Sequence, residues 1–379
     1  MSNLSIRENV KGYVRDTYLG LSDIEYNKEY SIIDCLIGSS QWGVSQKAVE
    51  THTKQDIQVQ AVYPEPFYDQ LLKPAILRRF GVVGLESGNI FFGHGSFNLA
   101  ERLIHKLISP GVMLGVGPQF NEIPSEFVAA GGTYQTVLIK NPDYAFPKEM
   151  LKNSLREGIS VMYIDNPNNP LGRLIDIQDL SELVAVANQE NVIVIVDEAY
   201  ADFVDDKQSA AHLVPHFQNV AVLRSFSKGL GLAAARIGYM FLSSAIAKYY
   251  QPLDVPFEPT LSSAELARAT LDDLAFIFHV RNSTAESKSL LMPFLEEIGF
   301  TILPTHPATS IMTLFREGHD VVKMFASIGV SVEPGSAFRK THSGWDNSYC
   351  RFRLPKKDDL QELQSRLKHI QHIRKEIPC

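Results

Sequence analysis

Between about residues 75 and 240, short apolar runs alternate with stretches of helical periodicity, and this alternation limits the possible folds more than any other feature. The apolar runs are "GNIFFG", "GVMLGVG", "QTVLI", "SVMYID", "NVIVIVDE" and "NVAVLRS". Between them, stretches such as "NLAERLIHKLI" and "DLSELVAVANQE" place their aliphatic residues on one helical face. Strands without polar residues are buried on both faces, as in a parallel sheet covered by helices on each side. We therefore predict an α/β core.

The sequence pattern changes after about residue 255. A long helical stretch is followed by shorter strand-like runs, "TILPT", "TSIMTLF" and "YCRFRLP", and then by a basic helix. This order is typical of a smaller α+β domain. We predict three parts: an N-terminal arm over residues 1–44 that packs against the small domain, a large domain over 45–254, and the small domain over 255–379.

Charge and composition exclude several classes of partner. The chain has a net charge of −7 and no long basic run, so neither nucleic acid nor an anionic membrane is expected as a partner. No run of about 18 apolar residues predicts a transmembrane helix, and the polar N-terminus predicts no signal peptide. The cysteines Cys35, Cys350 and Cys379 lie far apart and form no metal-binding spacing. A cytoplasmic location is the expectation.

Small residues and a helix start follow the run "NIFF". This segment, "GHGSFN", contains Gly95, Ser96 and Phe97. Ligands of open α/β sheets bind beyond the carboxyl ends of the strands, where the N–H groups of a helix start bind phosphate. A tight turn into a helix is the alternative. The dinucleotide fingerprint G-x-G-x-x-G fails at Asn98, which argues against a nicotinamide oxidoreductase.

Polar residues also follow the next two buried runs. The segment "DNPNNPLG" after "SVMYI" contains Asn169, and its prolines forbid a helix while its asparagines offer neutral donors and acceptors. Asp197 follows "NVIVIV", where a partly desolvated carboxylate requires a cation or an N–H donor, and Tyr200 comes shortly after. A rigid turn, a structural ion pair and a core aromatic are the alternative interpretations.

The segment "SFSKGLGLAAARIGY" after "NVAVLR" supplies hydroxyl groups and two cations. It contains Ser225, Ser227, Lys228 and Arg236. A lysine whose amine is desolvated becomes a nucleophile that forms Schiff bases, although a surface lysine on a loop is the alternative. The four strand ends together offer groups for a phosphate, a basic ring nitrogen and an aldehyde. Pyridoxal phosphate is the cofactor that uses all of them.

Three motifs carry a family resemblance. "NPNNPLG", "VDEAYADF" and "SFSKGLGLAAARIGY" occur in this order within roughly residues 60 to 355. Their order and spacing resemble those of the fold-type I pyridoxal-phosphate enzymes, specifically the class I/II aminotransferases close to histidinol-phosphate aminotransferase. The resemblance implies a fold of the aspartate aminotransferase type, with a mostly parallel mixed sheet in the large domain. It also implies a homodimer with the active site at the subunit interface.

The resemblance further implies a role for each matching residue. Lys228 would form the Schiff base with the cofactor and shuttle the proton between Cα and C4′. Asp197 would pair with the ring nitrogen, and Tyr200 and Asn169 would hydrogen-bond the phenolic oxygen. The phosphate would be bound by Ser225, Ser227, Arg236 and the backbone of Gly95, Ser96 and Phe97.

Four further positions rest on shorter matches. "GVGPQF" nominates Phe120 for stacking on the pyridine ring, and "AVYPEP" nominates Tyr63 for reaching the phosphate of the neighbouring subunit. In "YCRFRLP" two arginines point away from the apolar face of a strand. By resemblance Arg351 binds the substrate carboxylate, while the residues alone do not separate it from Arg353. "GSSQWG", which starts at Gly38, stands in place of a family segment of the type N-E-N-P-F-G, and Gly38 is a substrate-binding candidate.

Departures from the family pattern lie on the substrate side. Leu171 replaces a threonine, and Thr309 and Ser310 stand where asparagine and phenylalanine are usual. The leading interpretation is an aminotransferase that acts on an α-amino acid or an amino-alcohol phosphate with a 2-oxo acid as partner. A decarboxylase, lyase or cyclase that uses the same cofactor is the alternative. A non-catalytic ligand-sensing domain is a weaker one, because no DNA-binding segment precedes the fold.

Overall fold

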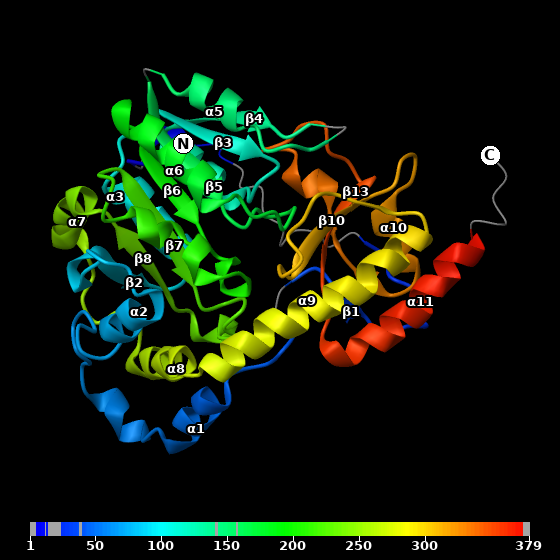
Figure 1. Ribbon diagram of the computed structural model, residues 1–379, viewed down its shortest axis with the longest axis horizontal. Helices are drawn as coiled ribbons and strands as arrows, with labels where there is room; N and C mark the ends of the chain where they lie inside the picture. Colours follow the sequence, from blue (N-terminus) through cyan, green and yellow to red (C-terminus); the bar gives the residue numbers. More distant parts are fainter. Residues whose placement is uncertain are drawn as a thin grey trace.

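The computed structural model describes residues 5–11, 13, 24–37, 40–140, 143–156 and 158–373. A seven-stranded sheet organises the larger part of the chain (Figure 1). Its strands, in spatial order, are β2 (Ile90–Gly93), β8 (Gly238–Leu242), β7 (Val220–Ser225), β6 (Ile193–Asp197), β5 (Ile159–Asp165), β3 (Val112–Gly117) and β4 (Thr133–Leu138). Only β8 runs antiparallel to its neighbours in this sheet, so the predicted mostly parallel mixed sheet is confirmed.

Helices cover both faces of this sheet, which explains why most of its strands read as continuous apolar runs. The run "QTVLI" is the exception, because it belongs to the edge strand β4, which is partly exposed. Side chains alternate along each strand, so Val161 and Ile195 face one core and Met162 and Val194 face the other. The first core is closed by α3 (Ser96–Lys106), α4 (Glu122–Ala129) and α7 (Ser244–Tyr250). The second is closed by α2 (Lys73–Phe80), α5 (Lys148–Ser154), α6 (Ile177–Gln189) and α8 (Leu261–Leu271).

A smaller antiparallel sheet lies beside the first (Figure 1). Its strands, in spatial order, are β12 (Glu333–Pro334), β13 (Tyr349–Arg353), β10 (Ile311–Phe315) and β9 (Thr301–Ile302). One face of it packs on α10 (Val321–Ser327) and α11 (Leu360–Ile373) in a separate apolar core. The segment preceding α1 (Gln46–Lys54) joins this part through β1 (Ile33–Asp34), which pairs in parallel with β11 (Val330–Ser331).

The long helix α9 (Leu274–Glu297) connects the two parts (Figure 1). Its Ile277 belongs to the core of the large sheet, and its Leu291 and Leu295 belong to the core of the small one. The single helix expected after residue 255 is in fact two helices, because Asp273 leaves the helical conformation and caps α9 by accepting the N–H of Phe276. The helix α8 falls within the predicted small domain, residues 255–379, but it packs on the core of the large sheet. The domain boundaries therefore stay a prediction.

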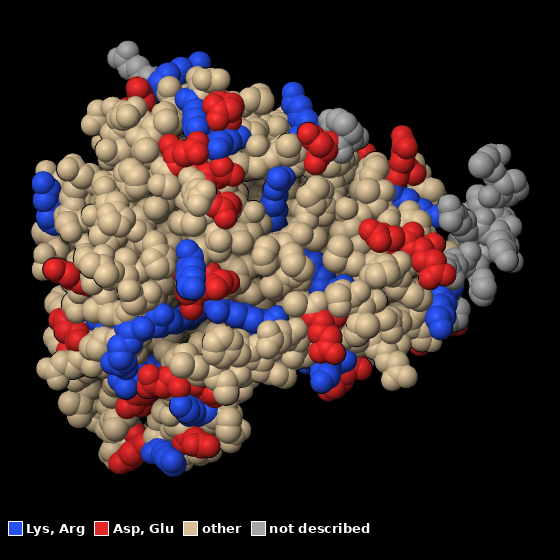
Figure 2. Space-filling view, in the orientation of Figure 1, with Lys and Arg blue, Asp and Glu red and all other residues tan. Residues whose placement is uncertain are grey.

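The surface carries charges of both signs. On the face drawn in Figure 2, a band of Lys and Arg crosses the region of α8 and α9 and is bordered by Asp and Glu. Such mixing weakens the long-range field of either sign. Within the described ranges, no helix has the length and apolar character needed to cross a membrane.

Candidate active site

A cavity of about 250 Å³ opens where β5, β6 and β7 end, next to the start of α3. Most of the residues predicted from the sequence line it. These are Gly95, Ser96, Phe97, Phe120, Asn169, Asp197, Tyr200, Ser225, Ser227, Lys228, Arg236 and Arg351. The residues come from segments that are far apart in the sequence, and parallel strands bring their carboxyl ends to one edge of the sheet.

One end of the cavity is built to hold an anion. Arg236 extends its guanidinium to Ser227 Oγ at 3.5 Å and to the His94 carbonyl oxygen at 3.3 Å. Gly95 has a φ of +94°, and a Cβ at this position would lie 3.0 Å from Nη2 of Arg236. The glycine therefore lets the N-terminus of α3 approach the arginine, and both attract negative charge.

Lys228 lies in the loop after β7 and lines the same cavity. Its Nζ is 5.5 Å from the ring centroid of Tyr200, and the side chain is half-buried at the cavity wall. The positive charge of Lys228 stabilises the ionised carboxylate of Asp197 and so acts to lower the pKa of Asp197. An amine, a phenol and a carboxylate thus face one small space.

Asp197 is buried at the end of β6. It accepts hydrogen bonds from the Ala199 N–H at 3.0 Å and from the Tyr163 hydroxyl at 3.3 Å. Burial nevertheless outweighs these bonds and raises the pKa of Asp197 to about 6. Tyr163 was not identified from the sequence, because it lies inside an apolar run and carries no signal of its own.

The pH dependence of stability tests this carboxyl group. Because its folded pKa of about 6 exceeds the ordinary value of 3.8, the folded state binds the proton more tightly than the unfolded state. The contribution of Asp197 to the free energy of unfolding of the cofactor-free protein should therefore fall by about 2 kcal/mol as pH rises from 4 to 7. Urea unfolding across this range should show that Asp197→Asn loses this part of the slope, whereas Asn at the exposed Asp358 should leave it intact.

Asp165, at the end of β5, is a second cavity carboxylate that was not singled out from the sequence. It pairs in register with Asp197 on β6. Its oxygens accept the N–H groups of Phe120 at 3.1 Å and Asn169 at 2.9 Å, so it ties two cavity loops together. Burial raises the pKa of Asp165 to about 7. Its position at the end of an apolar run was the available signal.

Arg351 on β13 also lines the cavity. Its Nη1 donates to Asn169 Oδ1 at 3.0 Å, and its Nη2 lies 2.5 Å from Oε2 of the buried Glu333. Arg353, two residues on, instead pairs with Asp34 at 3.2 Å outside the cavity. The structure therefore places Arg351 and not Arg353 at the site. Glu333 was not predicted from the sequence.

One predicted residue, Tyr63, lies elsewhere. Tyr63 is 81% exposed, contacts the ring of Phe257 and does not line the cavity. A role toward a neighbouring subunit stays a prediction for it. Gly38 lies outside the described residues.

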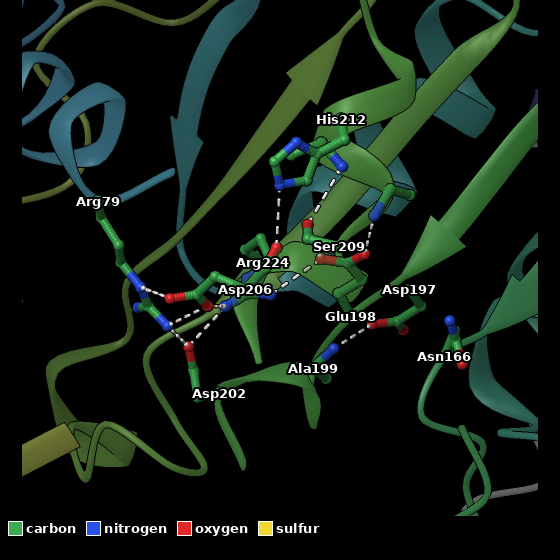
Figure 3. A network of polar contacts seen from close by, with 12 residues as sticks. Arg79, Asn166, Asp197, Glu198, Ala199, Asp202, Asp206, Ser209, His212 and Arg224 are labelled. Atoms are coloured by element: carbon green, nitrogen blue, oxygen red, sulfur yellow. Dashed lines mark hydrogen bonds and ion pairs between the residues drawn. The ribbon is translucent and has the colours of Figure 1, made fainter. Parts of the chain in front are cut away.

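A buried ion-pair network lies behind the cavity (Figure 3). Glu198 and Asp197 are adjacent in the chain but have different partners: Asp197 lines the cavity, whereas Glu198 lies 2.9 Å from Arg224. Arg224 also bonds Asp202 at 2.6 Å. The remaining members of the network are Arg79, Asp206 and Arg281. The network anchors the segment that carries Tyr200.

The residues present fit pyridoxal phosphate. The anion-binding end suits its phosphate, Asp197 suits its ring nitrogen, and the amine of Lys228 suits its aldehyde carbon. All the residues that this fit requires line the cavity.

Comparisons with known proteins agree with this fit. A family model described as aminotransferase class I and II matches residues 34–367. The histidinol-phosphate aminotransferase of a Geobacillus species is 27% identical over 324 residues, 84% of this chain and 87% of the relative. Two solved histidinol-phosphate aminotransferases share the fold. That of Clostridium acetobutylicum has a TM-score of 0.80 and 18% identity, covering 90% of this chain and 100% of its own. That of Sinorhizobium meliloti, in complex with pyridoxal 5′-phosphate, has a TM-score of 0.77 and 20% identity, covering 91% and 92%.

The family match spans both sheets and the whole cavity, and it confirms the activity class and the cofactor predicted from the motifs. The chain belongs to the class I and II aminotransferases, which use pyridoxal phosphate.

Proposed function

We propose that this enzyme transfers an amino group between an α-amino acid, or an amino-alcohol phosphate, and a 2-oxo acid in a ping-pong cycle. The observation that carries the proposal is that Lys228, Asp197 and Arg351 open onto one cavity. An amine that can bond covalently, a carboxylate and a guanidinium are the groups that amino-group transfer requires.

Each cavity residue has a chemical task. Bound here, pyridoxal phosphate supplies a ring that withdraws electrons from the α-carbon of the amino acid. Lys228 moves the proton to and from that α-carbon. Ionised Asp197 holds the ring nitrogen protonated, and Tyr163 orients this carboxylate. Phe120 lies at the cavity wall, where it would stack on the ring.

The remaining polar groups hold the cofactor in place. Tyr200 and Asn169 hydrogen-bond its phenolic oxygen. Its phosphate is bound by Ser225, Ser227, Arg236 and the N–H groups of Gly95, Ser96 and Phe97. These residues would hold the phosphate at the end of the cavity near Arg236 and leave Lys228 free to react with the aldehyde carbon.

Arg351 binds the carboxylate of the amino donor in this proposal. Arg351→Gln should raise the KM for an amino-acid donor by about 10- to 100-fold, because a hydrogen bond to a charged group is lost. Steady-state kinetics with Arg353→Gln provide the matched control, since that arginine lies two positions away and pairs with Asp34. An equal effect of both variants would contradict the assignment.

A donor screen tests the reaction itself. The purified enzyme, loaded with pyridoxal phosphate, is incubated with amino donors and 2-oxoglutarate, and glutamate is measured. The relatives are named histidinol-phosphate aminotransferases, so histidinol phosphate belongs in the first panel. Formation of glutamate supports the proposal. Release of carbon dioxide or ammonia without glutamate contradicts it and favours the decarboxylase or lyase alternative.

We further propose a cytoplasmic homodimer whose active site lies at the subunit interface. Exposed apolar side chains near Tyr63, including Ile57 and Val62, support an interface at this surface. Analytical ultracentrifugation should find a dimer, and Tyr63→Ala should weaken cofactor binding. A monomer that binds the cofactor with full affinity would contradict this assembly.

A further inference from the structure

A lysine occupies the buried face of α9 where an apolar residue is expected. The buried positions of this helix are Ile277, Val280, Thr284, Ser287, Lys288, Leu291 and Leu295. Their spacing of three and four residues is that of a core-facing stripe. Lys288 is 1% exposed, and a buried ammonium is costly unless polar partners satisfy it.

Four neutral oxygens surround the ammonium of Lys288. Its Nζ lies within hydrogen-bond distance of Thr305 Oγ1 (2.7 Å), the His306 carbonyl (2.8 Å), Thr309 Oγ1 (3.1 Å) and the Ile311 carbonyl (2.9 Å), so its three N–H groups are shared among these four acceptors. All four acceptors belong to the segment 305–311 that leads into β10. Burial lowers the pKa of Lys288 to about 7 and, together with this cation, lowers the pKa of His306. Hydrogen bonds to this one amino group therefore hold residues 305–311 together.

The same segment is bonded to the loop that carries Asn169. The Gly172 carbonyl accepts the His306 N–H at 2.9 Å and the Thr309 hydroxyl at 2.9 Å. A Cβ at Gly172, whose φ is +70°, would lie 2.2 Å from the Ile311 carbonyl oxygen. The two segments are thus in direct contact, and Thr309 bonds both Lys288 and Gly172.

We propose that Lys288 is a positioning residue for the active site: its ammonium holds segment 305–311 against loop 168–172 and thereby fixes Asn169 in the cavity. Asn169 bonds Arg351 at 3.0 Å, and Thr313, which follows the gathered segment, donates to the Pro170 carbonyl at 3.1 Å. The chemical role of Asn169 rests on the proposed function, whereas the coupling of the two segments does not. Thr309, a departure from the family pattern, belongs to this coupling.

Hydrogen exchange in the cofactor-free protein tests the coupling. Lys288→Met removes the charge and keeps most of the stem, and it should speed exchange at Gly172 and His306 by about tenfold or more. Thr309→Val, a milder and nearly isosteric change, should act in the same direction. Lys73→Met is the matched control, because Lys73 is also largely buried on a helix but pairs with Asp69. Unchanged exchange of both segments in folded Lys288→Met and Thr309→Val would overturn the proposal.

A double-mutant cycle with Asn169→Ala tests the effect on the site. The readout is the pH midpoint of the absorbance change of the bound cofactor, which Asn169 tunes in the proposed function. Lys288→Met should shift this midpoint in the wild-type background and produce less than about a third of that shift in Asn169→Ala. Equal shifts in both backgrounds would overturn the proposal. Failure of the wild-type protein to bind the cofactor would instead contradict the proposed function, and the exchange experiment would still decide the coupling.

Discussion

Replacing Lys228 with alanine is expected to lower kcat for amino-group transfer by roughly 10⁴-fold. The amine lies at the cavity wall with Asp197 and Tyr200, and in the proposed function it both bonds the cofactor and moves a proton at the α-carbon. Single-turnover reaction of the cofactor-loaded variant with an active donor measures the loss directly.

Cofactor binding by the variant and a control substitution at another lysine show whether the loss of activity is specific to Lys228. The cofactor should still bind to Lys228→Ala through the anion-binding end at Ser227 and Arg236, which absorbance after gel filtration would show. Alanine at the exposed Lys248 should leave kcat unchanged. A Lys228→Ala enzyme that retains kcat within tenfold of the wild type would contradict the catalytic role.

Replacing Arg224 with methionine is expected to lower the free energy of unfolding by about 3 to 5 kcal/mol. The guanidinium is 1% exposed and bonds Glu198 at 2.9 Å and Asp202 at 2.6 Å (Figure 3). Removing it leaves two buried carboxylates without their shared cation, and burial already raises the pKa of Glu198. Chemical denaturation at neutral pH measures the loss.

Arg281→Met is the control for this network. Arg281 bonds Asp206 at 2.9 Å at the more open end, where its side chain is 16% exposed. Water can replace part of that interaction, so the expected loss is smaller, about 1 to 2 kcal/mol. Losses of equal size for the two variants would show that burial does not set the strength of the network.

Much of the fold follows from the alternation of apolar runs and helical stretches. Runs such as "NVIVIV" are buried on both faces, and each ends at a polar residue, so both the strands and their functional ends could be predicted. The strand β8 was not predicted, because its apolar residues directly follow Arg236 and partly overlap the motif "SFSKGLGLAAARIGY". Its antiparallel direction depends on pairing with β2 and β7, which are distant in the sequence.

The candidate site was predictable where chemistry follows a strand end and unpredictable where it depends on packing. Lys228, Asp197 and Asn169 stand at such ends and reach the same cavity. The contact of Glu333 with Arg351 arises from antiparallel pairing of β12 with β13. No local sequence pattern predicts this pairing. Lys288 looks like a surface lysine in the sequence, and only its surroundings in the fold reveal that it is buried.

Hydride trapping tests the central assignment most directly. The protein is incubated with pyridoxal phosphate, reduced with borohydride, digested and examined by mass spectrometry. We expect the cofactor on the peptide that contains Lys228, and we expect none on the corresponding peptide of the Lys228→Ala variant. Cofactor attached to a different lysine, with the Lys228 peptide unmodified, would contradict it.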